Sequence, residues 1–138
     1  MSVKIRQVEQ TAILQVVLKA NTPANSQVFT NIILEPGLGA VQQLQIPPNE
    51  AWVLEDLFVR DSPTVDVILT FRKNLTEDVM KTAPLSALVV SNPARPRIGK
   101  QVYEGNSIMT IVAQNLAAVG DSDVTVTAFL KIRRFIAS

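Results

Sequence analysis

Apolar and polar residues alternate with a period of two along most of this 138-residue chain. Successive side chains of an extended strand point to opposite faces of a sheet, so this period is typical of half-buried β-strands. The pattern predicts about eight strands, over 11–19, 27–35, 40–46, 52–60, 64–72, 85–90, 107–114 and 123–133.

Proline- and glycine-rich breaks separate these segments, at 21–25, 36–39 and 47–49. Proline fixes φ and removes a ladder donor, so it ends a strand. The connection over 61–63 is short enough for a hairpin, which predicts that 52–60 and 64–72 are antiparallel neighbours. By the same argument, 107–114 and 123–133 form a second pair.

The only long irregular region is 73–106. A single helical turn is expected over 76–81, capped by Thr76, with two acidic residues near its positive end. Pro93 and Pro96 exclude ladder hydrogen bonds, so 91–97 is expected to be an irregular loop.

These elements predict an all-β fold with a single domain over 1–138, a two-sheet β-sandwich of jelly-roll or Greek-key type. In 52–60, Trp52, Leu54 and Phe58 are expected to share a face with Asp56, which would be buried with Arg60 or Arg72. The predicted core includes Leu54, Phe58, Val67, Leu69, Phe71, Ile108, Val126, Ala128 and Leu130. Phe129 is the one apolar residue on the outward face of the last strand.

The chain has no His and no Cys, although 47% of it is apolar. The commonest general base, metal ligand and soft nucleophile are therefore all missing, and we expect no enzymatic activity and no cofactor. Asp121 and Asp123 share a tight loop and could bind calcium, but the ligand repeat is absent, so a turn is favoured and no metal site is predicted.

Thirteen basic and twelve acidic residues leave a net charge of +1. Strong nucleic-acid binding usually requires a clustered excess of Lys and Arg, so we do not expect it. The richest apolar stretch, 12–18, is too short to span a bilayer, so direct membrane insertion is not expected either.

Two groups of residues are candidates for contacts between subunits. Arg95, Arg97 and Lys100, followed by Tyr103, could grip a phosphate or a neighbour's carboxylate such as Glu50 or Asp61, although a solvated loop explains them equally well. The second group is the polar, uncharged strand that carries Gln42, Gln43 and Gln45. The apolar content is high for one core of this size, which also favours self-association.

A Pro-turn-Glu-x-Trp element opens a long strand at Ile46-Pro-Pro-Asn-Glu-Ala-Trp-Val-Leu-Glu-Asp-Leu-Phe-Val59. A glycine-containing turn opens another strand at Tyr103-Glu-Gly-Asn-Ser-Ile-Met-Thr-Ile-Val112. This pattern resembles small single jelly-roll structural proteins of phages and archaeal viruses. The resemblance implies a capsid, decoration or spike-type subunit, and it transfers no catalytic residue.

We therefore expect a non-enzymatic virion structural subunit that is made in the host cytoplasm and self-assembles through sheet faces and the 73–106 loop. A homo-oligomeric ring of three or five subunits is favoured over a dimer, and other capsid proteins are further candidate partners. The alternative is a carbohydrate- or ligand-binding β-sandwich module, such as a tail-fibre tip or lectin-like domain, with Tyr103, Asn92 and Asn106 as its loop residues. A third hypothesis is a cupin-like metal enzyme. The absence of histidine disfavours it, because such metal sites characteristically use imidazole ligands.

Overall fold

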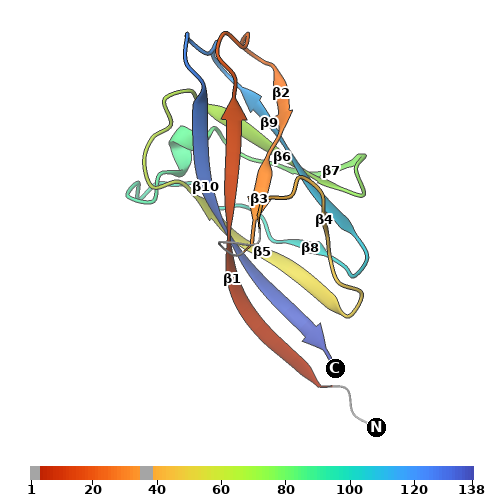
Figure 1. Ribbon diagram of the computed structural model, residues 1–138. Helices are drawn as coiled ribbons and strands as arrows, with labels where there is room; N and C mark the ends of the chain where they lie inside the picture. Colours follow the sequence, from red (N-terminus) through yellow and green to blue (C-terminus); the bar gives the residue numbers. More distant parts are fainter. Residues whose placement is uncertain (1–3, 35–38) are drawn as a thin grey trace.

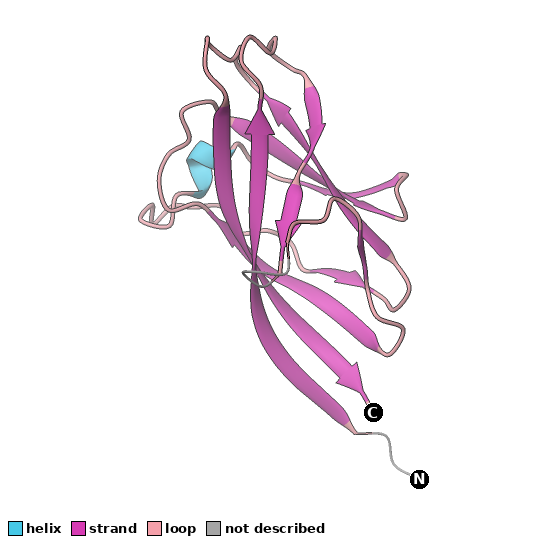
Figure 2. Ribbon diagram, viewed as in Figure 1, coloured by secondary structure: helices cyan, strands magenta, loops and turns pink. Residues whose placement is uncertain are grey.

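The computed structural model describes residues 4–34 and 39–138, and these residues form ten strands in two antiparallel five-stranded sheets (Figures 1 and 2). The first sheet has the order β3-β1-β10-β5-β8, and the second has β2-β9-β6-β7 with β4 also paired to β9. The strands are β1 (Ile5–Leu18), β2 (Gln27–Phe29), β3 (Asn31–Ile33), β4 (Leu44–Gln45), β5 (Glu50–Phe58), β6 (Val67–Lys73), β7 (Glu77–Lys81), β8 (Gln101–Tyr103), β9 (Ile108–Asn115) and β10 (Val124–Ala137).

The pairing follows one long hairpin that is folded over on itself. β1 pairs with β10, β2 with β9, β5 with β8 and β6 with β7, all antiparallel. Rolling such a hairpin into two sheets is the winding of a jelly roll. The predicted two-sheet β-sandwich is confirmed, with ten strands among the described residues instead of about eight. The predicted strand over 27–35 is divided into β2 and β3, β7 and β8 are additional, and the predicted strand over 85–90 is absent.

Both predicted hairpins are wrong, because the strands concerned lie in different sheets. β5 belongs to the first sheet and β6 to the second, and β9 and β10 are divided in the same way. The period of two reports which face of a strand is buried but says nothing about its hydrogen-bonding partner. The segments 59–66 and 116–123 therefore cross between sheets.

The core lies between the two sheets, and seven of the nine residues predicted for it are buried: Leu54, Val67, Leu69, Phe71, Val126, Ala128 and Leu130. Phe58 is a wrong prediction. Ile132 pairs with Leu54 whereas Lys131 pairs with Asp56, so Glu55 is an extra residue that forms a β-bulge. The bulge reverses the alternation, so Leu57 is buried and Phe58 faces outward.

Ile108 is the second core residue that was predicted wrongly, because it is only half-buried. In β9 the inward positions are Met109, Ile111 and Ala113, which pair with or lie beside the buried residues of β6. All residues from Met109 to Ala113 are buried, so no alternation of apolar and polar residues shows which side of β9 faces the core.

The helical turn predicted over 76–81 is instead strand β7. Asn74 and Leu75 both have positive φ, 55° and 72°, and they turn the chain straight back after β6. The predicted strand over 85–90 is instead a short 3-10 helix, Leu85–Leu88, which follows Pro84. The predicted strand over 40–46 is reduced to β4 and a single bridge at Val41. The predicted strand end at Glu35 and the break over 36–38 lie outside the described residues.

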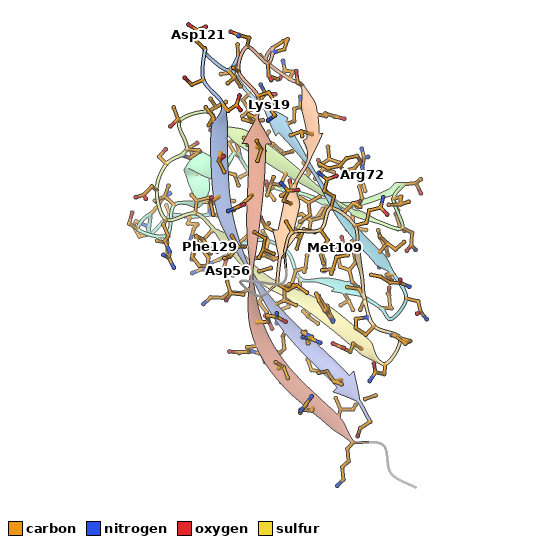
Figure 3. The ribbon with its side chains drawn as sticks, in the orientation of Figure 1. Lys19, Asp56, Arg72, Met109, Asp121 and Phe129 are labelled. Atoms are coloured by element: carbon orange, nitrogen blue, oxygen red, sulfur yellow. The ribbon has the colours of Figure 1, made fainter. Side chains whose placement is uncertain are left out.

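β1 and β10 are the longest strands and pair with one another over all 14 of their residues. They extend past the other strands to the end of the molecule where both termini lie (Figure 1). There the Ser138 amide donates to the Lys4 carbonyl at 3.0 Å. The loops that carry Lys19 and Asp121 lie at the opposite end (Figure 3). No helix in the described part of the chain is long and apolar enough to cross a membrane.

Candidate assembly surfaces

The loop that precedes β8 is fixed to β5 by two arginines that share one carboxylate. Arg95 Nη1 lies 2.9 Å from Asp56 Oδ1, and Arg97 Nη1 lies 3.0 Å from Asp56 Oδ2. Arg95 also donates to the Leu57 carbonyl at 3.3 Å. The expectation that Asp56 pairs with Arg60 or Arg72 is therefore wrong, because the bulge turns Asp56 outward towards this loop.

The two arginines differ in what they offer to a neighbouring molecule. The side chain of Arg95 is only 9% exposed and is committed to Asp56, whereas that of Arg97 is 69% exposed. Lys100 is exposed as well. Of the two acids named as targets for these cations on a neighbour, Asp61 is exposed and Glu50 is buried. Arg97, Lys100 and Asp61 are therefore the surface-accessible members of this group.

Tyr103 does not lie on the surface. It is fully buried opposite Trp52, and its hydroxyl donates to the Arg72 carbonyl at 3.0 Å. Burial raises the pKa of this hydroxyl well above its ordinary value. Tyr103 is thus a core residue in the described fold, and a contact with a neighbour or a glycan does not fit it.

The two asparagines named with Tyr103 have different environments. The Asn92 side chain accepts from the Ala94 amide at 3.0 Å and donates to the Ala87 carbonyl at 3.4 Å, so it holds its own loop together. Asn106 is exposed in a turn, with φ of 68°. The predicted loop site for a glycan therefore lacks its aromatic residue.

Gln42, Gln43 and Gln45 are all exposed beside the short strand β4. The Gln42 amide donates to Asn31 Oδ1 at 3.3 Å, and no side-chain hydrogen bond is found for the other two among the described residues. These carboxamides remain open to contacts with another molecule.

An apolar row crosses the outer face of the first sheet, and we call it the outer row. It consists of Ile33, Ile13, Phe129 and Phe58, which stand opposite one another on β3, β1, β10 and β5. All four are half-buried, although no second layer covers this face in the described structure. The Phe58 and Phe129 rings stack with centroids 5.5 Å apart. Phe129 lies near Asp56 on the adjacent strand (Figure 3).

Cations border the outer row. The Arg60 guanidinium lies 4.6 Å from the Phe129 ring centroid, and Lys131 Nζ lies 6.0 Å from that of Phe58. Sequence reasoning marked Phe129 as facing outward but could not place it beside Phe58 and Ile13, because that requires the register between strands. An apolar strip with a charged border is the usual anatomy of a protein–protein contact.

A buried polar cluster on the inner side of the first sheet was also missed, and we call it the Glu50 network. Arg134 donates to both oxygens of Glu50, at 2.7 Å and 3.0 Å, and to Gln10 Oε1 at 2.9 Å. The Trp52 indole N–H donates to Glu50 Oε1 at 3.0 Å. The hydrogen bond from Arg134 is the main cause of a lowered Glu50 pKa, and burial opposes it.

A hollow with a volume of about 460 Å³ lies at the β5 bulge. Its lining includes Arg133, which forms two ion pairs. Arg133 Nη2 lies 2.9 Å from Glu9 Oε1, and Arg133 Nε lies 3.0 Å from Glu55 Oε1. The Nε–H is not aligned for a hydrogen bond with Glu55. Among the described residues, no group of three or more metal-binding side chains comes together, at Asp121 and Asp123 or elsewhere.

A second hollow of about 440 Å³ lies on the outer face of the second sheet. Polar side chains line it, including Gln27, Gln114, Thr70 and Arg72. The exposed ring of Phe29 stands opposite Val112, which forms part of the same lining.

The chain matches no known protein-family model. No curated protein is significantly similar to it in sequence.

Proposed function

We propose that this protein is a non-enzymatic structural subunit of a virion, of capsid, decoration or spike type, that assembles with copies of itself. The outer row is the observation that carries this proposal. This half-buried apolar strip lies on a sheet face that no other described part of the chain covers. A second subunit that removes it from water would stabilise the assembly by a free energy of roughly 25 cal/mol per Å² of buried apolar area.

Other features support the same role. The jelly-roll winding agrees with the resemblance of the 46–59 and 103–112 segments to viral structural proteins. Exposed Arg97 and Lys100 from the long loop, together with Gln42, Gln43 and Gln45, supply polar groups for the rim of a contact. A closed ring of three or five copies would cover the outer row of each subunit.

Two measurements test the proposal. Mass photometry or analytical ultracentrifugation at micromolar concentration should show a discrete oligomer, and a persistent 15.1 kDa monomer would contradict self-assembly. Mass spectrometry of virus particles purified from the source should find the chain in a fixed ratio to the other capsid proteins. Its absence from the particles would contradict the virion role.

Placing a charge in the middle of the outer row should prevent assembly through it. Ile13→Lys keeps the strand's inward face unchanged, so the fold should persist, but the lysine would have to be desolvated at the contact. We expect at least a tenfold weaker association by mass photometry. Thr125→Lys, an exposed change on the same face of β10, is the matched control and should leave association unchanged.

The hollow beside Phe29 favours a second candidate function, carbohydrate binding. Stacking on an exposed ring, combined with hydrogen bonds from carboxamides such as Gln27 and Gln114, is chemistry that suits a sugar. Specific, saturable binding on a glycan array that is lost in Phe29→Ala would establish this function. Saturable binding that Phe29→Ala leaves intact would place the glycan elsewhere.

A further inference from the structure

One edge of β1 is unpaired for part of its length. β10 pairs with all 14 residues of β1 on one side, but on the other side β3 pairs only with Ile13, Leu14 and Gln15. The Gln10 side chain donates to the Leu34 carbonyl at 3.1 Å, so the chain leaving β3 stays close to β1 as far as Gln10. Among the described residues, nothing pairs with Ile5 to Glu9 on this second side, and we call this stretch the β1 edge.

The backbone groups of the β1 edge that face away from β10 belong to the odd-numbered residues. Ser138 N donates to Lys4 O, so Lys4 points towards β10, and alternation then turns Ile5, Gln7 and Glu9 the other way. A second contact agrees with this assignment. Ile32 exchanges both backbone hydrogen bonds with Val41, which leaves Ile33 to pair with the odd-numbered Ile13.

The β1 edge carries few of the features by which proteins protect an edge strand. It contains no proline and no glycine, and the β1–β10 register runs without a bulge. The large apolar side chain of Ile5 is 67% exposed. Arg6 and Glu9 are its only charges, and they have opposite signs.

We propose that the β1 edge pairs antiparallel with the β1 edge of a second copy of this chain, about a two-fold axis at Gln7. Gln7 is the centre of the stretch from Ile5 to Glu9, so all five residues find a partner. Gln7 exchanges two backbone hydrogen bonds with Gln7 of the second copy, and Ile5 does the same with Glu9.

Charge and space select this register from its alternatives. A two-fold axis at Arg6 or at Glu9 would place like charges directly opposite each other, which is destabilising. An axis at Val8 would place the second copy's Lys4 opposite Ala12, next to the end of β3. The axis at Gln7 places Arg6 opposite Val8, which keeps like charges apart, and Lys4 opposite Gln10, two residues farther from the end of β3 than an axis at Val8 would.

The second copy is the occupant that this edge fits best. The stretch is self-complementary in length, charge and hydrogen-bonding direction, which an isologous contact requires. This two-fold contact lies on a sheet edge, whereas the assembly proposed above uses sheet faces and the 73–106 loop. Either contact can therefore fail without the other.

A single cysteine tests the contact directly, because the natural chain has none. In the proposed pair the two Gln7 Cα atoms lie about 5.5 Å apart, as in a hydrogen-bonded antiparallel pair. That separation is within the range of about 4.4–6.8 Å that a disulfide spans. Gln7→Cys should therefore give a covalent dimer under mild oxidation, as the main band on a non-reducing gel.

Two cysteine controls decide what that result means. Gln27→Cys, at another exposed glutamine on the edge strand β2, should give at least tenfold less dimer. Equal yields for Gln7→Cys and Gln27→Cys would overturn the proposal. Val8→Cys should also crosslink poorly, because Val8 faces Arg6 of the second copy, and a stronger crosslink there than at position 7 would overturn the axis at Gln7.

A proline variant tests the contact without a thiol. The Gln7 N–H points away from β10, so Gln7→Pro removes a donor from the free edge and leaves the β1–β10 ladder intact. Its unfolding midpoint should stay close to that of the natural chain, while dimerisation weakens at least tenfold in sedimentation equilibrium. Undiminished dimerisation of a folded Gln7→Pro variant would contradict pairing through this edge.

Discussion

Arg134→Met should lower the free energy of unfolding by about 3–5 kcal/mol, because it leaves a buried carboxylate without its partner. The side chain of Glu50 is only 7% exposed, and Arg134 binds both of its oxygens. The Trp52 indole is then the only remaining hydrogen-bond donor to Glu50 among the described residues. Urea unfolding followed by tryptophan fluorescence measures the effect, since Trp52 is the only tryptophan.

Arg133→Met is the matched control, at the preceding residue of the same strand. Arg133 faces outward and pairs with Glu9 and Glu55 at the surface, where such ion pairs contribute about 0–1 kcal/mol. The double variant with Glu50→Gln and Arg134→Met should lose clearly less than the two single losses added together. Equal losses for Arg133→Met and Arg134→Met would show that the Glu50 network does not stabilise the fold.

The stability contributed by Glu50 should also depend on pH. The pKa of Glu50 in the folded chain is lowered from 4.5, mainly by the hydrogen bond from Arg134. Its stabilising effect is therefore complete above pH 4.5 and declines as the pH falls from there towards the lowered value. The stability gap between the natural chain and Glu50→Gln should be constant from pH 6 to 5 and should narrow below pH 4.5.

The fold class and most of the core could be predicted from sequence because each depends on a local pattern. Alternation correctly placed Val67, Leu69 and Phe71 inward, because every second residue of β6 from Val67 to Phe71 is buried in the core. It failed after Glu55, where one extra residue reverses the faces of β5. A bulge leaves no mark in the hydrophobic pattern when apolar residues occupy both faces, as Leu57 and Phe58 do.

Strand partners were harder to predict, because a short connection does not require a hairpin. The loop after β5 could be read as a hairpin turn or as a crossing between sheets, and only the closure of the whole sandwich decides between them. The same limit applies to the candidate surfaces. Arg95 was predicted to contact a phosphate or a neighbour's carboxylate, but its carboxylate partner is Asp56 of its own chain, 39 residues away in sequence.

Gly105→Ala should also be strongly destabilising, by about 3 kcal/mol, the upper end of what overpacking usually costs. A Cβ at this position would lie 2.5 Å from the Pro48 carbonyl oxygen and 3.0 Å from that of Pro47. These contacts are with backbone, so no side chain can rotate to relieve them. Two hydrogen bonds hold the turns together, from Asn106 N to Ile46 O and from Ile46 N to Ser107 O, each at 2.9 Å.

Gly120→Ala is the control, because a Cβ there meets nothing within 4 Å. Its unfolding free energy should remain within about 0.5 kcal/mol of the natural chain's or rise slightly. The turns that open 46–59 and 103–112 contact each other at Gly105, so each turn is the packing surface of the other. Equal stability of Gly105→Ala and Gly120→Ala in thermal unfolding would contradict this close contact.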